Sequence, residues 1–177
     1  MSDKRSKAFV RRFKGANEHN DKDDFRTPPY LFHWIETRYG KVEFDGACVD
    51  GLNNLAEALR LEDPWPNGAT IYSNPPFDSE SITKWVCKGY EHAKYGGGLH
   101  IMIIPDKLTQ VFFKNLFPLI DEIVFLGGRV NFESPYAVKG GTSMNGSVIL
   151  VQRGLEGMPS VDAVLLRDMK KAFGEVK

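Results

Sequence analysis

The sequence has few cysteines, no long hydrophobic run and no excess of charge of either sign. Its two cysteines, Cys48 and Cys87, are too few for a disulfide framework or for a zinc site of their own. No apolar run reaches the roughly eighteen residues that a membrane-spanning helix requires, so we expect no membrane association. The N-terminal stretch also lacks the apolar segment of a secretory signal, which predicts a cytoplasmic protein with reduced thiols.

Charge is balanced overall but unevenly distributed along the chain. Lysine and arginine number 23, as do aspartate and glutamate, so the composition does not suggest a strongly basic surface for nucleic acid. The first fourteen residues are nevertheless basic, with Lys4, Arg5, Lys7, Arg11, Arg12 and Lys14 against Asp3. Such an arm can reach phosphates, although a solvated tail without contacts is the simpler interpretation.

The composition is that of one folded domain. With 177 residues, of which 42% are hydrophobic and 26% charged, the chain is long enough for a single hydrophobic core. Residues 1–24 are polar and without apolar periodicity, which predicts a flexible charged arm. We therefore expect one domain over residues 25–177.

Hydrophobic periodicity predicts helices that alternate with strands. We expect helices over residues 28–39, 50–60, 79–95, 109–119 and 159–173. We expect strands over residues 42–48, 69–73, 99–104, 123–126 and 147–151. This alternation indicates an α/β fold with a mostly parallel sheet. The short interval between Asp45 and Asn74 leaves no room for the two further strands of a full doubly wound domain, so the sheet is expected to be reduced.

The most specific motif is Asn74-Pro75-Pro76-Phe77, which directly follows a predicted strand. Ligands of parallel sheets bind outside the carboxyl ends of the strands, so this loop and residues 45–50 are expected to line one crevice. The Asn74 side-chain oxygen and the Pro75 carbonyl can accept hydrogen bonds from an amino group on a conjugated ring. Phe77 offers a face for stacking such a ring. A rigid loop without chemistry is the alternative.

Several segments in this order resemble the phage-encoded, Dam-related family of DNA N6-adenine methyltransferases. The segments are Asp24-Phe25-Arg26-Thr27-Pro28-Pro29-Tyr30-Leu31-Phe32, Phe44-Asp45-Gly46-Ala47-Cys48, the Asn-Pro-Pro-Phe loop, Ile103-Ile104-Pro105 and residues 125–132. The resemblance covers roughly residues 24–152. It implies a reduced Rossmann-like fold and S-adenosylmethionine-dependent transfer of a methyl group to N6 of a flipped-out adenine, in the host cytoplasm if the chain is encoded by a phage.

Roles for individual residues follow from this resemblance. The catalytic loop would be Asn74, Pro75, Pro76 and Phe77. The methyl donor would be held by Thr27, Pro28, Asp45, Ala47, Asp50 and Asn54, with Glu62 and Asp63 as alternatives to Asp50 for the ribose. DNA contacts are expected from Lys107, Arg129, Asn131 and Lys139, in addition to the basic arm. No metal site is expected, because His92 and His100 lack partners at ligand spacing.

Two alternatives to DNA methylation remain open at this point. Loops of this kind also serve methyltransferases that act on RNA bases or on protein amides, because both acceptors present an amino group on a conjugated system. The neutral charge and the loose glycine turn after Asp45 would also suit a catalytically inactive binding module. The retained Asn74, Pro75 and Phe77 argue against the inactive module, because a binder has no need of that loop.

Overall fold

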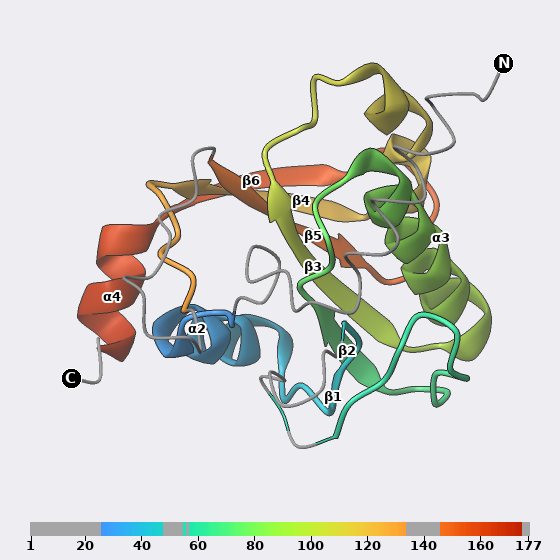
Figure 1. The fold of residues 1–177 in the computed structure, drawn as a ribbon, viewed down its shortest axis with the longest axis horizontal. Coiled ribbons are helices and arrows are strands. Elements are labelled where there is room, and N and C mark those ends of the chain that lie inside the picture. The colour runs from blue at the N-terminus through green and yellow to red at the C-terminus, as the bar shows by residue number, and fades with distance from the viewer. Residues whose placement is uncertain (1–25, 48–54, 56, 134–145, 175–177) are drawn as a thin grey trace, which may run out of the picture.

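The computed structural model describes residues 26–47, 55, 57–133 and 146–174, which build a six-stranded sheet with helices on both faces (Figure 1). The strands are β1 (Phe44–Asp45), β2 (Thr70–Ser73), β3 (Leu99–Pro105), β4 (Glu122–Gly127), β5 (Ser147–Gln152) and β6 (Ser160–Leu165), in the order β1-β2-β3-β5-β4-β6. Strand β5 is antiparallel to both of its neighbours, and the other neighbouring strands pair in parallel. The predicted α/β class with a mostly parallel, reduced sheet is confirmed. The arm predicted over residues 1–24 lies outside the described residues.

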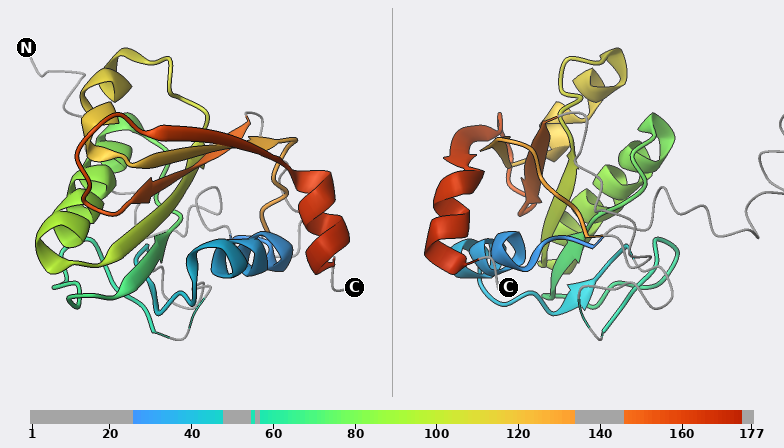
Figure 2. Two further views of the ribbon diagram at one scale, coloured as in Figure 1. Left: turned by 180° about the vertical axis from the view of Figure 1, so that it is seen from behind. Right: turned by 60° about the vertical axis from the view of Figure 1, so that its left-hand side comes forward.

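Helices cover the two faces of the sheet unequally. They are α2 (Pro29–Tyr39), α3 (Ser79–Gly96) and α4 (Leu166–Phe173). Figures 1 and 2 show α3 on one face and α2 with α4 on the other. Because side chains alternate along a strand, Ile101 and Ile103 of β3 join the core under α2 and α4, while Met102 and Ile104 join the core under α3. This double burial explains the unbroken apolar run that marked β3 in the sequence.

Helix α3 has clear signals at both ends. The Asp78 carboxylate accepts a hydrogen bond of 2.9 Å from the backbone N–H of Ser81 and so caps the first turn. Gly97 ends the helix in the left-handed conformation, with φ of 66°, which glycine adopts without a steric penalty. The helix therefore runs directly from the loop after β2 to the turn before β3. No helix in the described part of the chain is both long and apolar enough to cross a membrane.

Three predicted boundaries near the N-terminus are corrected. Helix α2 begins at Pro29, one residue later than predicted, with Pro28 as its cap. Strand β1 is limited to Phe44–Asp45 rather than spanning residues 42–48. The helix predicted over residues 50–60 is wrong in its described part, because Ala58 forms a parallel bridge with Asp45. The backbone there bonds to the edge of β1 instead of to its own next turn; residues 50–54 lie outside the described part.

Two further helices were predicted with the wrong extent. Residues 109–119 form two short 3₁₀ helices, η2 (Val111–Asn115) and η3 (Phe117–Leu119), rather than one helix. Pro118 has no N–H and cannot continue an α-helical hydrogen-bond ladder. The last helix was predicted over residues 159–173, but its first part is strand β6, whose backbone pairs with β4 from Ser160 to Leu165. Pairing with β4 decided the conformation of this segment, since Val161 remains 67% exposed and packing contributes little there.

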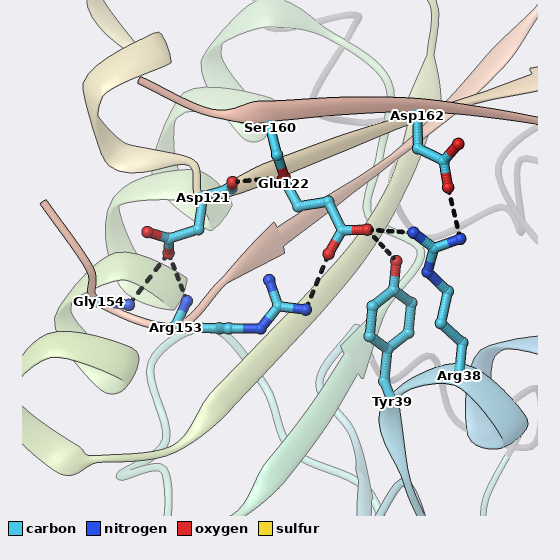
Figure 3. A network of polar contacts seen from close by, with 8 residues as sticks. All are labelled: Arg38, Tyr39, Asp121, Glu122, Arg153, Gly154, Ser160 and Asp162. Atoms are coloured by element: carbon cyan, nitrogen blue, oxygen red, sulfur yellow. Dashed lines mark hydrogen bonds and ion pairs between the residues drawn. The ribbon is translucent and has the colours of Figure 1, made fainter. Parts of the chain in front are cut away.

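A buried carboxylate joins α2 to the sheet at the amino end of β4 (Figure 3). Glu122 is 7% exposed and accepts hydrogen bonds from Arg38 at 2.6 Å, Tyr39 at 3.1 Å and Arg153 at 2.8 Å. Arg38 also pairs with Asp162 of β6 at 2.7 Å. Burial by itself would raise the pKa of Glu122, but these hydrogen bonds and charges outweigh it and hold the pKa below its ordinary value.

The variant Glu122→Gln is expected to lower the free energy of unfolding by about 1–3 kcal/mol at pH 7, the contribution of hydrogen bonds to charged groups. Since the pKa of Glu122 is lowered in the folded protein, this contribution is present above the ordinary glutamate pKa. It is lost as pH falls through the lower folded value. Denaturant unfolding at neutral and acidic pH measures the difference.

A matched control is the exposed Glu80–Lys84 pair on α3, which is 2.7 Å long. Glu80→Gln is expected to change the unfolding free energy by less than about 0.5 kcal/mol, because solvent screens this pair. Equal effects of the Glu80 and Glu122 substitutions would contradict a stabilising role specific to Glu122.

Candidate active site

The carboxyl ends of the parallel strands gather the residues singled out in the sequence. Strands β1 and β2 pair with Asp45 opposite Tyr72, so the turn after Asp45 and the loop after Ser73 leave the sheet side by side. At the same edge, Lys107 follows the end of β3 and Arg129 follows the end of β4. The expected meeting of the two loops at one edge therefore follows from the strand register.

A buried polar cluster lies at the ends of β1 and β2. The Thr27 and Tyr72 hydroxyls are 2.5 Å apart, and Thr27, Tyr72 and Asp45 are 4%, 0% and 2% exposed. Burial raises the pKa of Tyr72 far above its ordinary value, and the negative charge of Asp45 adds to the shift. The Tyr72 hydroxyl therefore stays protonated and links the segment before α2 to β2, in register with Asp45 at the end of β1.

The turn after β1 is held closely against β2. The Gly46 N–H donates to the Tyr72 carbonyl at 2.7 Å, and the Ala47 N–H donates to the Asp45 carboxylate at 3.2 Å. A Cβ at position 46 would lie 2.7 Å from an Ile71 methyl carbon and 2.8 Å from the Ser73 hydroxyl. The close approach of β2 therefore requires glycine at position 46. The tight turn begins directly after Asp45, which is the last residue of β1.

The Asn74–Phe77 loop is fixed from two directions. The Lys107 ammonium donates a short hydrogen bond to the Phe77 carbonyl, and the Phe77 ring packs against Phe132 with centroids 6.1 Å apart. Asn74 and Phe77 are half-buried, Pro75 is buried and Pro76 is exposed. Lys107 was predicted as a DNA contact, and the structure places its charged group on the loop itself.

A buried histidine supports the residue before Asn74. The Gln152 amide nitrogen donates to the carbonyls of Val86 and Leu119 at 2.9 Å and 2.7 Å, so its oxygen faces His100. His100 Nδ1 therefore donates to Gln152 at 2.8 Å, which leaves Nε2 to accept from the Ser73 hydroxyl at 3.0 Å. The imidazole is thereby fixed as a neutral ring in one tautomer.

Helix α3 makes room for this histidine through a glycine. A Cβ at Gly89 would lie 1.9 Å from His100 Nδ1 and 2.2 Å from the Gln152 side-chain oxygen. The Trp65 ring covers His100, with centroids 5.1 Å apart. Trp65 itself lies in the core beside α3. Full burial lowers the pKa of His100 to about 4.

The remaining predicted residues divide into described and undescribed positions. Pro28 is buried and Ala47 is half-buried, whereas Arg129 and Asn131 are exposed after β4. Asp50, Asn54 and Lys139 lie outside the described residues. Among the described residues, no group of three or more His, Cys, Asp or Glu side chains could hold a metal ion.

Sequence reasoning missed three residues that shape this site. Tyr72 was assigned only to a strand, although its position two residues before Asn74 is a usable signal. His100 was considered for metal binding alone, yet a histidine within an apolar strand must find hydrogen-bond partners when buried. Phe132 carried no signal beyond its place in a resembling segment, because its contact with Phe77 joins residues far apart in the chain.

This mostly parallel sheet, with an acidic end on its first strand and an Asn-Pro-Pro-Phe loop on its second, is consistent with a Rossmann-like methyltransferase fold. The model of the DNA N-6-adenine-methyltransferase (Dam) family matches residues 14–175, and the chain belongs to that family. It is 25% identical over 171 residues to a DNA N-6-adenine-methyltransferase of Escherichia phage T1, covering 82% of this chain and 69% of the relative. The chain is therefore an adenine-specific DNA methyltransferase, which confirms the resemblance and favours DNA over the RNA and protein acceptors.

The protonation of His100 is directly testable. Because its pKa is lowered from 6.5 to about 4, the unfolded chain binds a proton in this interval and the folded protein does not. Stability is expected to fall by about 3 kcal/mol through this group as pH drops from 6.5 to 4. NMR of the imidazole should show one neutral tautomer, protonated at Nδ1, over most of this range, with protonation of Nε2 only near its lower end. A His100 signal that titrates near pH 6.5 would contradict the buried network.

Proposed function

We propose that this chain transfers a methyl group from S-adenosylmethionine to N6 of adenine at the carboxyl edge of β1 and β2. The observation that carries the proposal is the position of Tyr72. Its hydroxyl belongs to the buried cluster with Thr27 and Asp45, and its backbone leads within two residues to Asn74. A donor beside the cluster and an acceptor at the loop would therefore be neighbours.

The chemistry of the buried cluster fits the amino-acid part of the donor. A carboxylate that is 2% exposed, such as that of Asp45, is stabilised by a cation, and the donor carries an ammonium group. Pro28 and Pro29 have no N–H, so the start of α2 offers fewer backbone donors than an ordinary helix N-terminus. We assign the buried Thr27 hydroxyl in this segment to the donor carboxylate. Asp50 and Asn54 are retained as proposed donor contacts.

The Asn74–Phe77 loop is proposed to hold the target base. The Asn74 side-chain oxygen and the Pro75 carbonyl would accept hydrogen bonds from the two amino hydrogens, which localises the nitrogen lone pair. Phe77 would stack on the base, an interaction of about 1–3 kcal/mol that helps to offset the cost of flipping it out of the duplex. When bound, S-adenosylmethionine supplies an electrophilic methyl group on sulfur for in-line attack by this nitrogen.

Exposed polar residues at the same edge are proposed to hold the DNA around the flipped base. Arg129 and Asn131 follow β4 and are exposed, and Lys139 is expected farther along the same connection. The basic arm within residues 1–24 is a further proposed phosphate contact. The single-domain organisation over residues 25–177 and the cytoplasmic location stay predictions.

Two separate substitutions should distinguish the residues that bind the methyl donor from those that promote methyl transfer. Asn74→Ala is expected to lower kcat by at least about a hundredfold, as the loss of a positioned hydrogen-bond group does in other active sites. Its donor affinity should remain near that of the wild type. Asp45→Asn should instead weaken donor binding, because the ammonium loses its buried counter-charge.

Calorimetric titration with S-adenosylmethionine and transfer of labelled methyl groups to DNA measure the two effects. Circular dichroism serves as the folding control for both variants. An Asn74→Ala variant with wild-type kcat would refute the assignment of the loop. Wild-type donor affinity in Asp45→Asn would refute the assignment of the cluster.

The position of Lys107 predicts a different phenotype from that of a phosphate contact. Lys107→Met should lower kcat several-fold at every salt concentration, because the Phe77 carbonyl loses its hydrogen bond. Arg129→Ala should weaken DNA binding and reduce the salt dependence of log K by about one unit of slope. Both kcat and DNA affinity are measured for the two variants at several salt concentrations. A reduced salt slope for Lys107→Met would instead support the phosphate contact predicted from the sequence.

A further inference from the structure

The Phe77 ring is supported by an aromatic residue from a distant part of the chain. Phe132 is 4% exposed, and its ring centroid lies 6.1 Å from that of Phe77 at an interplanar angle of 57°. Phe77 is half-buried and packs against the core that contains Phe132. Phe77 is thus packed in part against the protein interior and keeps part of its surface exposed.

The backbone around Phe132 is fixed by the segment before α2. Glu133 and Arg26 exchange two backbone hydrogen bonds, of 2.9 Å and 3.0 Å, in an antiparallel bridge. On the other side of Phe132, the Val130 side chain is fully buried. Phe132 is therefore held between a buried anchor and a backbone bridge, and its ring has little freedom to follow a displaced Phe77.

These contacts form a continuous chain of neighbours around the candidate site, which begins and ends at Arg26. Arg26 is next to Thr27, whose hydroxyl contacts Tyr72, and β2 leads from Tyr72 into the Asn74–Phe77 loop. Phe77 then contacts Phe132, beside the Glu133–Arg26 bridge. Thr27, at the proposed donor site, and the Asn74–Phe77 loop, at the proposed acceptor site, are therefore connected in two ways. One connection runs through β2 and the other through Phe132. The second connection includes one contact made by side-chain packing alone, between Phe77 and Phe132, and a single substitution can remove that contact.

We infer that Phe132 is a positioning residue that sets the orientation of Phe77 for stacking with the target base. This inference rests on the proposed function, because it assumes that Phe77 contacts the base. Phe132 acts through Phe77 and does not touch the substrate. A flat face that is fixed before DNA arrives loses less side-chain entropy on binding than a face free to rotate.

A double-mutant cycle tests this role. Phe132→Leu, Phe77→Leu and the double variant are compared by kcat and KM for DNA at a temperature where circular dichroism shows all of them folded. Phe132→Leu is expected to lower kcat/KM about three- to tenfold, the contribution of one aromatic pair. In the Phe77→Leu background the same substitution should have almost no further effect, because the ring that it positions is already absent.

Phe113→Leu is the matched control, since Phe113 is fully buried on the opposite face of the sheet under α3. It should leave kcat/KM unchanged in both backgrounds while lowering thermal stability. Phe132→Met, which keeps most of the side-chain volume but not the ring, is carried through the same cycle. Methionine should reproduce the leucine phenotype if the flat ring is what matters.

Two kinds of result overturn the inference. Losses that multiply independently in the double variant would make Phe132 an ordinary core residue, as would an equal loss of kcat/KM in Phe113→Leu. Wild-type kcat/KM in Phe132→Leu, together with an inactive Asn74→Ala, would remove the role of Phe132 and leave the proposed function intact. An active Asn74→Ala would instead refute the proposed function itself.

Discussion

The parallel pairing of β1 with β2 places Asp45 opposite Tyr72, and the arrangement of the candidate site depends on this register. Successive side chains of β2 point to opposite faces, so Tyr72 joins the Thr27 hydroxyl on the α2 side while Ser73 joins His100 on the α3 side. A slip of one residue would exchange these faces and break both contacts at once. One four-residue strand thus supports both the Thr27–Tyr72 contact and the start of the Asn74–Phe77 loop.

The amino ends and the carboxyl ends of the parallel strands have different roles. At the amino end of β4, the Glu122 carboxylate is held by three hydrogen bonds and connects α2 to the sheet, which stabilises the helix that begins two residues after Thr27. At the carboxyl edge, polar groups are buried at strand ends or lie on loops, where ligands of parallel sheets bind. The described residues at this end of the sheet can contribute to catalysis by positioning the reacting groups rather than by supplying a strong base.

Local sequence signals were sufficient wherever local physics dominates. The Asp78 cap, the Gly97 turn and the amphipathic pattern of α3 agree with each other, and that helix was predicted close to its true bounds. The apolar run of β3 was equally clear. Prediction failed where pairing with a distant segment decided the outcome: Ser160–Leu165 became strand β6 against β4, and Ala58 bridged to Asp45 instead of forming a helix.

The sequence by itself determined the class of sheet, the place of the Asn74–Phe77 loop and the family, because periodicity and motif order are written along the chain. Only the tertiary structure decided which groups meet: Tyr72 with Thr27, His100 with Ser73, Lys107 with the Phe77 carbonyl and Phe132 with the Phe77 ring. The three hydrogen bonds among these contacts join residues that are 27 to 45 positions apart in the sequence. Such contacts depend on strand order and register, which no local pattern of residues specifies.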